Sequence, residues 1–127
     1  MSKKRFSRRI MIGIAVAIFT TAIAIPSYQA TIRHSRESVL QGNLVAMRTA
    51  IKWYVQDKQK APQNLQDLAD TGYFRGLPID PITNSNSTWK PEIRDVVISA
   101  ENTERGIADV HSGSSAQSSK GTPYSAW

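Results

Sequence analysis

The sequence predicts an α+β protein with a long N-terminal membrane-spanning helix and a small C-terminal head, made of a short helix and an antiparallel β-sheet. Three observations predict this class. An uncharged apolar stretch follows a basic N-terminus, a helical period continues from it until Pro62, and the period changes to two from Trp89 onward. The chain divides into residues 1–9, a basic cytoplasmic flank; 10–32, a transmembrane helix; 33–60, its amphipathic continuation; and 61–127, the head.

The uncharged stretch 10–32 is long enough to cross a bilayer. Its 23 residues make about 35 Å of helix, and a hydrocarbon core is about 30 Å thick. Polar residues begin at Ser27, so this end is expected at the membrane interface. Pro26 predicts a kink or a locally unwound turn. The membrane and assembly residues are expected to be Ile10, Ile14, Ile18, Ala22, Ile25, Pro26 and Tyr28.

A basic N-terminal cluster supplies five of the six net positive charges and leaves 11 basic against 10 acidic side chains in the rest of the chain. Because cationic flanks stay in the cytoplasm, we expect the N-terminus inside and the head outside. The charge therefore indicates topology, and we expect no nucleic-acid partner. The cytoplasmic anchor residues are Lys3, Lys4, Arg5, Arg8 and Arg9.

Two other interpretations fit the same segment. A cleavable secretory signal also has a basic start and an apolar core, and Ala22–Ala24 provides small residues for cleavage. Pro26 and the continuing helical pattern disfavour this interpretation. A plain signal anchor without any role in assembly is the second alternative.

An amphipathic helix continues from Ile32. Its apolar residues recur at spacings near three and four, and charged or amide side chains occupy the other faces. Gly42 is its weak point, since glycine costs about 1 kcal/mol relative to alanine inside a helix. The residues expected to pack against the head are Leu40, Leu44, Met47, Ile51 and Tyr54.

The head is expected to begin with a helix that Pro62 opens and Thr71–Gly72 caps, followed by an extended turn. The alternating patterns predict short strands, two to four in all, laid across the long helix. The strand residues are Trp89, Pro91 and Ile93, then Val97 and Ile98, then Gly106 to Ser112, with Glu101–Gly106 as the turn before the last. The expected head core is Leu65, Leu68, Tyr73, Leu77, Pro78, Pro81, Trp89, Tyr124 and Trp127.

No disulfide bond can stabilise the head, because the chain contains no cysteine. Its last loop, residues 112–124, is rich in serine and glycine and must be ordered by packing or by an ion. Asp109 and His111 share one strand face, yet no nucleophile motif accompanies them, so no catalytic residue is predicted.

Several segments resemble one family. Ala22–Gln29, Ala-Ile-Ala-Ile-Pro-Ser-Tyr-Gln, is similar to the end of the hydrophobic helix in type IV pilins and type II secretion pseudopilins. Four later parts of the chain resemble the major pseudopilin, the G-type subunit: Gly72–Pro81, Trp89, Gly106–Gly113 and Gly121–Trp127. The resemblance implies a lollipop-shaped subunit whose N-terminal helices bundle in a helical filament that acts as a secretion piston.

The same resemblance implies the partners and the location. The partners would be copies of the chain, other pseudopilins, the inner-membrane secretion platform and the lipid bilayer. The chain would be a single-pass protein of the bacterial inner membrane with a periplasmic head, and not an enzyme. The runner-up is a signal-anchored periplasmic binding or scaffold module that does not polymerise. An extracytoplasmic enzyme is a weaker third possibility.

Two features differ from the family pattern. No glycine precedes Phe6, and Arg9 occupies the register of a glutamate that pairs with a neighbouring amino terminus, so leader cleavage and N-methylation stay open. Major pseudopilins hold calcium with carboxylates of the final loop, whereas residues 112–127 contain no Asp or Glu. We therefore expect no cofactor and no strong calcium site, since Ca²⁺ needs six to eight oxygen ligands.

Overall fold

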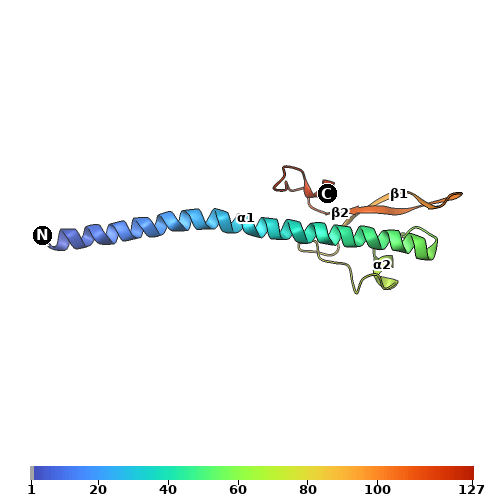
Figure 1. Cartoon of the computed structure of the whole chain (residues 1–127), viewed down its shortest axis with the longest axis horizontal. Helices are drawn as coiled ribbons and strands as arrows, with labels where there is room; N and C mark the ends of the chain where they lie inside the picture. Colours follow the sequence, from blue (N-terminus) through green and yellow to red (C-terminus); the bar gives the residue numbers. More distant parts are fainter. Residues whose placement is uncertain (1) are drawn as a thin grey trace. The chain divides into compact units, whose positions relative to one another are not determined.

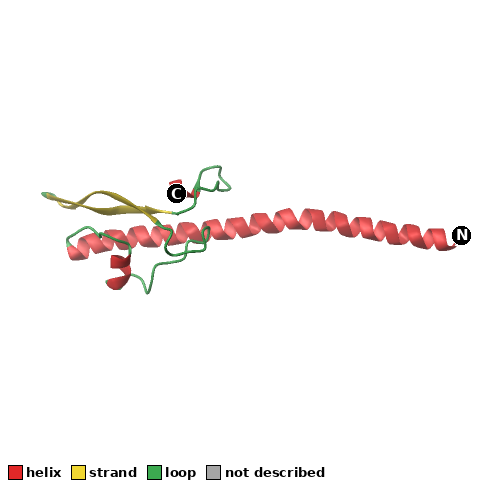
Figure 2. Cartoon of the chain, turned by 180° about the vertical axis from the view of Figure 1, so that it is seen from behind, coloured by secondary structure: helices red, strands yellow, loops and turns green. Residues whose placement is uncertain are grey.

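The structure is a computed structural model that describes residues 2–127. It comprises two units, Met1–Ser35 and Arg36–Trp127. Along the chain lie α1 (Ser2–Lys58), α2 (Gln66–Asp70), β1 (Lys90–Ser99), β2 (Asn102–His111) and the short 3-10 helix η1 (Tyr124–Ala126), as Figures 1 and 2 show. The long apolar N-terminal helix and the small antiparallel sheet agree with the predicted fold class.

The N-terminal unit is the first part of α1. The helix continues without a break through Pro26, so the alternative of a locally unwound turn is wrong. Proline removes one hydrogen bond, and the bonds on either side keep the turn closed. The hydroxyl of Thr21 donates to the main-chain oxygen of Ala17 at 2.8 Å, and that of Ser27 donates to Ile23 at 3.3 Å. These polar side chains are thus satisfied within their own helix.

The core of the C-terminal unit is built on one face of α1, where the predicted apolar stripe lies. Figure 1 shows the β-hairpin on one side of this part of α1 and α2 on the other. A stripe with a spacing of three and four residues is wide enough to meet both. The buried cluster consists of Leu40, Leu44, Met47, Ala50, Ile51, Tyr54, Leu65, Leu68, Trp89, Ile107, Val110 and Tyr124.

Helix α2 begins at Gln66, so the prediction that Pro62 opens this helix is wrong. The carboxylate of Asp67 accepts hydrogen bonds from the main-chain N–H groups of Gln63 and Asn64 at 2.9 and 3.1 Å. These bonds stabilise a turn before the helix. The predicted end is correct, because Thr71 is the C-cap and Gly72 follows with a φ of 88°.

Strands β1 and β2 form an antiparallel hairpin in which Glu92 pairs with Asp109 and Val97 pairs with Thr103. The turn predicted at Glu101–Gly106 is wrong, because β2 already begins at Asn102. Residues 102–105 are polar and mostly exposed, and their strand structure comes from pairing with β1 rather than from burial. The sheet has two strands, at the lower end of the expected range.

Strand β2 is closely covered on its outer edge by the segment that follows α1. The main-chain N–H of Ile107 donates to the carbonyl of Pro62 at 2.8 Å, and the carboxylate of Glu104 accepts from the N–H of Ala61 at 2.8 Å. Gly106 lies at this contact, and a Cβ there would come within 2.5 Å of the Ala61 Cβ. The absence of a side chain at position 106 therefore permits the approach.

We predict that Gly106→Ala destabilises the C-terminal unit by about 1–3 kcal/mol, because the backbone at Pro62 must move and strain its bond to Ile107. The matched control is Gly42→Ala, where an added Cβ meets no atom within 4 Å. That change removes a helix-interior glycine and should stabilise by up to about 1 kcal/mol. Urea unfolding of the detergent-solubilised chain, followed by tryptophan fluorescence, measures both. Equal stability of Gly106→Ala and the wild type would contradict the close-approach argument.

Candidate functional site

The first candidate site is the apolar surface of the N-terminal unit. α1 is the one helix within residues 2–127 that is long and apolar enough to cross a membrane, and none of its most apolar window is buried. By length and composition it is a membrane anchor or a signal sequence, since both have these properties. The residues expected in the membrane are all exposed in this unit: Ile10, Ile14, Ile18, Ala22, Ile25, Pro26 and Tyr28.

The basic cluster lies at the start of α1. Lys3, Lys4, Arg5, Arg8 and Arg9 are all exposed, and the first turn carries no acidic residue. Cations near a helix N-terminus oppose the helix dipole, typically by 0.3–1 kcal/mol each. The cluster therefore does not serve helix stability, and a surface that attracts cations, such as anionic lipid headgroups, gives it a favourable environment.

In the C-terminal unit, a buried carboxylate from α1 holds the final loop. Glu37 is 5% exposed. Its Oε1 accepts from the N–H of Ser119 at 2.7 Å and from the hydroxyl of Tyr124 at 2.8 Å, and its Oε2 accepts from the Ser119 hydroxyl at 2.5 Å. A loop without acidic residues is thus ordered by an acid 82 positions earlier. Sequence reasoning missed this, although Glu37 stands three residues before Leu40 on the apolar stripe.

A second buried carboxylate, Asp80, organises the other long loop. It is fully buried and accepts from the Ser112 hydroxyl at 2.6 Å and from the N–H groups of Ile82 and Gly113 at 2.9 and 3.2 Å. The bond to Ile82 lies within the loop that contains Asp80. The bonds to Ser112 and Gly113 also attach this loop to the end of β2.

Polar side chains gather where the hairpin meets α1 and the C-terminal segment. Arg48 of α1 donates through Nε to Asp109 at 2.6 Å, and through Nη2 to the main-chain oxygens of Val110 and Trp127 at 3.1 and 2.8 Å. Nδ1 of His111 also lies 2.6 Å from the Trp127 oxygen. Two residues from different elements therefore hold the same main-chain oxygen.

The Arg48–Asp109 contact changes the acidity of the carboxylate. Partial burial raises the pKa of Asp109, but the hydrogen bonds from Arg48 and the Val110 N–H, with the charges of Arg48 and His111, outweigh it. The pKa of Asp109 therefore lies below its ordinary value. Elsewhere, the hydrogen bond to the Asp57 carboxylate, at 2.5 Å, raises the pKa of Tyr73 to about 12.

The residues expected in the head core occupy two environments. Leu65, Leu68, Trp89 and Tyr124 are buried. The Trp127 ring packs edge-on against Tyr124 with centroids 5.4 Å apart, and the Lys120 ammonium lies 5.4 Å from its centroid. The tail thus folds back on the sheet side.

The partly buried residues of the expected head core are Tyr73, Leu77, Pro78, Pro81 and Trp127. The residues expected to pack against the head, Leu40, Leu44, Met47, Ile51 and Tyr54, are all buried.

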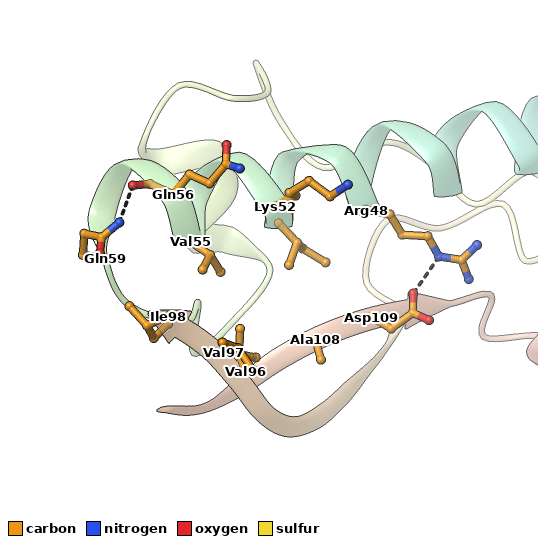
Figure 3. A pocket seen from close by; sticks show the side chains of 11 residues that line it. Arg48, Lys52, Val55, Gln56, Gln59, Val96, Val97, Ile98, Ala108 and Asp109 are labelled. Atoms are coloured by element: carbon orange, nitrogen blue, oxygen red, sulfur yellow. Dashed lines mark hydrogen bonds and ion pairs between the residues drawn. The ribbon is translucent and has the colours of Figure 1, made fainter. Parts of the chain in front are cut away.

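An open groove of about 780 Å³ separates the end of α1 from the hairpin (Figure 3). Val55 of α1 faces Val96, Ile98 and Ala108 of the strands across it. The Arg48–Asp109 ion pair, drawn as a dashed line in Figure 3, lies at one end. Among the described residues lining this groove there is no serine, threonine or cysteine that could act as a nucleophile.

No protein-family model, no curated protein and no solved structure matches this chain. What the fold and its sites define is a class: an α+β chain whose long apolar N-terminal helix is able to cross a membrane, and whose small C-terminal unit folds on the continuation of that helix.

We predict that Glu37→Gln loosens the final loop and lowers the free energy of unfolding by about 1–3 kcal/mol, because one amide oxygen replaces two carboxylate oxygens as acceptor. Hydrogen exchange at the Ser119 amide should become faster while exchange in the hairpin stays slow. Glu101→Gln, at an exposed hairpin position, is the control. Unchanged protection at Ser119 in Glu37→Gln would refute the role of the carboxylate.

A second prediction concerns pH. Since folding lowers the pKa of Asp109 below 3.8, its contribution to stability is present above that pH and is lost as the pH falls through the lowered pKa. The stability difference between the wild type and Asp109→Asn should therefore shrink below about pH 4. Arg48→Met, which removes the guanidinium partner, should flatten the pH dependence in the same way. Urea midpoints measured from pH 7 downward test this, and parallel curves for all three proteins would count against it.

Proposed function

We propose that this chain is the structural subunit of a pseudopilin-type or pilin-like filament, anchored by α1 in the bacterial inner membrane with its head in the periplasm. The observation that carries the proposal is the exposed apolar surface of the N-terminal unit. Such a surface needs lipid, or sister helices once it leaves the lipid. The resemblance of the C-terminal segments to the major pseudopilin supports the particular kind of filament.

The apolar helix also has a face suited to close helix packing. Gly13, Ala17 and Thr21 follow one another at intervals of four and therefore lie on one face. Small residues at this spacing let helix backbones approach closely in a bilayer. The hydroxyl of Thr21 is already bonded to Ala17, so it brings no unsatisfied donor to such a contact. Repetition of one heterologous contact between copies generates a helical filament.

Partners in this proposal are copies of the chain, other pseudopilins and the inner-membrane platform. Extension of the filament would push cargo by a piston-like movement, and the subunit itself would perform no catalysis. The alternative is a signal-anchored module that never polymerises. It is favoured by one observation, the lack of any acidic residue before Glu37 to pair with a neighbour's terminal charge.

The proposal predicts a ladder of multimers when membranes containing the chain are washed with carbonate and treated with an amine-reactive crosslinker. Ala17→Leu should shorten the ladder by obstructing the small-residue face. Ala15→Leu is the matched control, because Ala15 lies about 200° around the helix from Ala17 and the change in volume is the same. A membrane-bound monomer alone would favour the alternative module. Equal effects of the two substitutions would contradict the assigned packing face without contradicting the filament proposal.

A further inference from the structure

Three potential metal ligands converge on one face of the hairpin. Nε2 of His111 lies 3.0 Å from Oε2 of Glu92 and 3.8 Å from Oδ2 of Asp109, and the three ligand atoms all lie within 4.8 Å of one another. The strand pairing produces this cluster, because Glu92 is the direct partner of Asp109 and His111 is two residues further along the same face. All three side chains are partly buried, so the site is reachable from solvent.

The remaining atom of each ligand is already held by a separate partner. Nδ1 of His111 lies 2.6 Å from the main-chain oxygen of Trp127, so this nitrogen carries the proton and Nε2 is left to bind. Oδ1 of Asp109 is bonded to Arg48 at 2.6 Å. Oε1 of Glu92 is paired with Arg94 at 2.8 Å. Outer partners of this kind orient the ligands of metal sites and set the tautomer of a ligating histidine.

From this arrangement we propose that Glu92, Asp109 and His111 bind one divalent transition-metal ion of the zinc type. One imidazole with two carboxylates suits zinc, whereas calcium requires six to eight oxygens. Ligands of a tetrahedral zinc ion lie about 3.3 Å apart, and the two separations from Nε2 bracket this value. Three protein ligands leave a coordination position open for water.

The ion has a structural consequence for the C-terminal unit. It joins the start of β1 to the end of β2, and His111 connects it to the segment that ends at Trp127. A ligand that binds only the folded state raises its stability. The site is independent of the filament proposal, because none of its atoms belongs to the N-terminal unit.

The test uses the full chain in detergent, stripped of metal with a chelator and titrated calorimetrically with Zn²⁺ at pH 7.5. We expect one saturable site per chain and a higher thermal midpoint in Zn²⁺. Co²⁺ should give the visible absorption bands of a bound ion, and Ca²⁺ at the same concentration should produce no shift. The absence of saturable Zn²⁺ binding would overturn the proposal and leave His111 as a side chain that only connects Glu92 and Trp127.

Variants locate the ion. Glu92→Gln should weaken Zn²⁺ binding about 10-fold or more, and His111→Gln should abolish it. Asp95→Asn, on an exposed residue of the same strand, and His34→Gln, the other histidine of the chain, are the controls and should bind as the wild type does. If His111→Gln does not fold, as circular dichroism would reveal, Glu92→Gln decides the outcome. Equal binding by all variants, or loss of binding in His34→Gln, would show an adventitious ion only.

Discussion

The structure of the C-terminal unit depends on the apolar face of α1 between residues 36 and 58. A segment the size of residues 61–127 is only marginally stable alone, and the chain has no cysteine that could form a disulfide bond. Leu40, Leu44 and Met47 supply a core surface that α2 and the hairpin share. The helix that presents the exposed apolar segment is therefore also the helix on which the rest of the unit folds.

Two buried carboxylates order the loops that the apolar core does not hold in place. Burying a carboxylate is costly unless hydrogen bonds replace its water, and Glu37 and Asp80 each receive at least three from the described residues. The final loop contributes N–H and O–H donors, and α1 contributes the acceptor. N–H and O–H groups that point at a carboxylate cannot coordinate a cation, which is bound by oxygen lone pairs. This physical complementarity explains how a loop without acidic residues is ordered within the described chain.

The parts of the fold set by local periodicity were predictable, whereas those set by strand register were not. The stripe of α1 and the cap at Gly72 follow from spacing and from backbone preference. The hairpin turn was misplaced because residues 102–105 are polar, and a turn at 101–106 would have paired Glu92 with Ser115. The actual register pairs Glu92 with Asp109, so the metal-ligand cluster could not be seen from the sequence. Glu37 was missed because its partners lie more than 80 residues away.

The charge of the N-terminal flank limits how the proposed filament can be built. Arg9 lies one residue before the apolar stretch, and no acidic residue precedes Glu37, which is committed to Ser119 and Tyr124. The segment of a sister helix that precedes Glu37 therefore offers Arg9 no carboxylate, and an unpaired charge in an apolar bundle is expensive. Either the flank stays at the level of the lipid headgroups, or another subunit supplies the acid. Because a flank held at the headgroups keeps the helix in the membrane, extension of such a filament requires another subunit that supplies the acid, unless the flank is first removed.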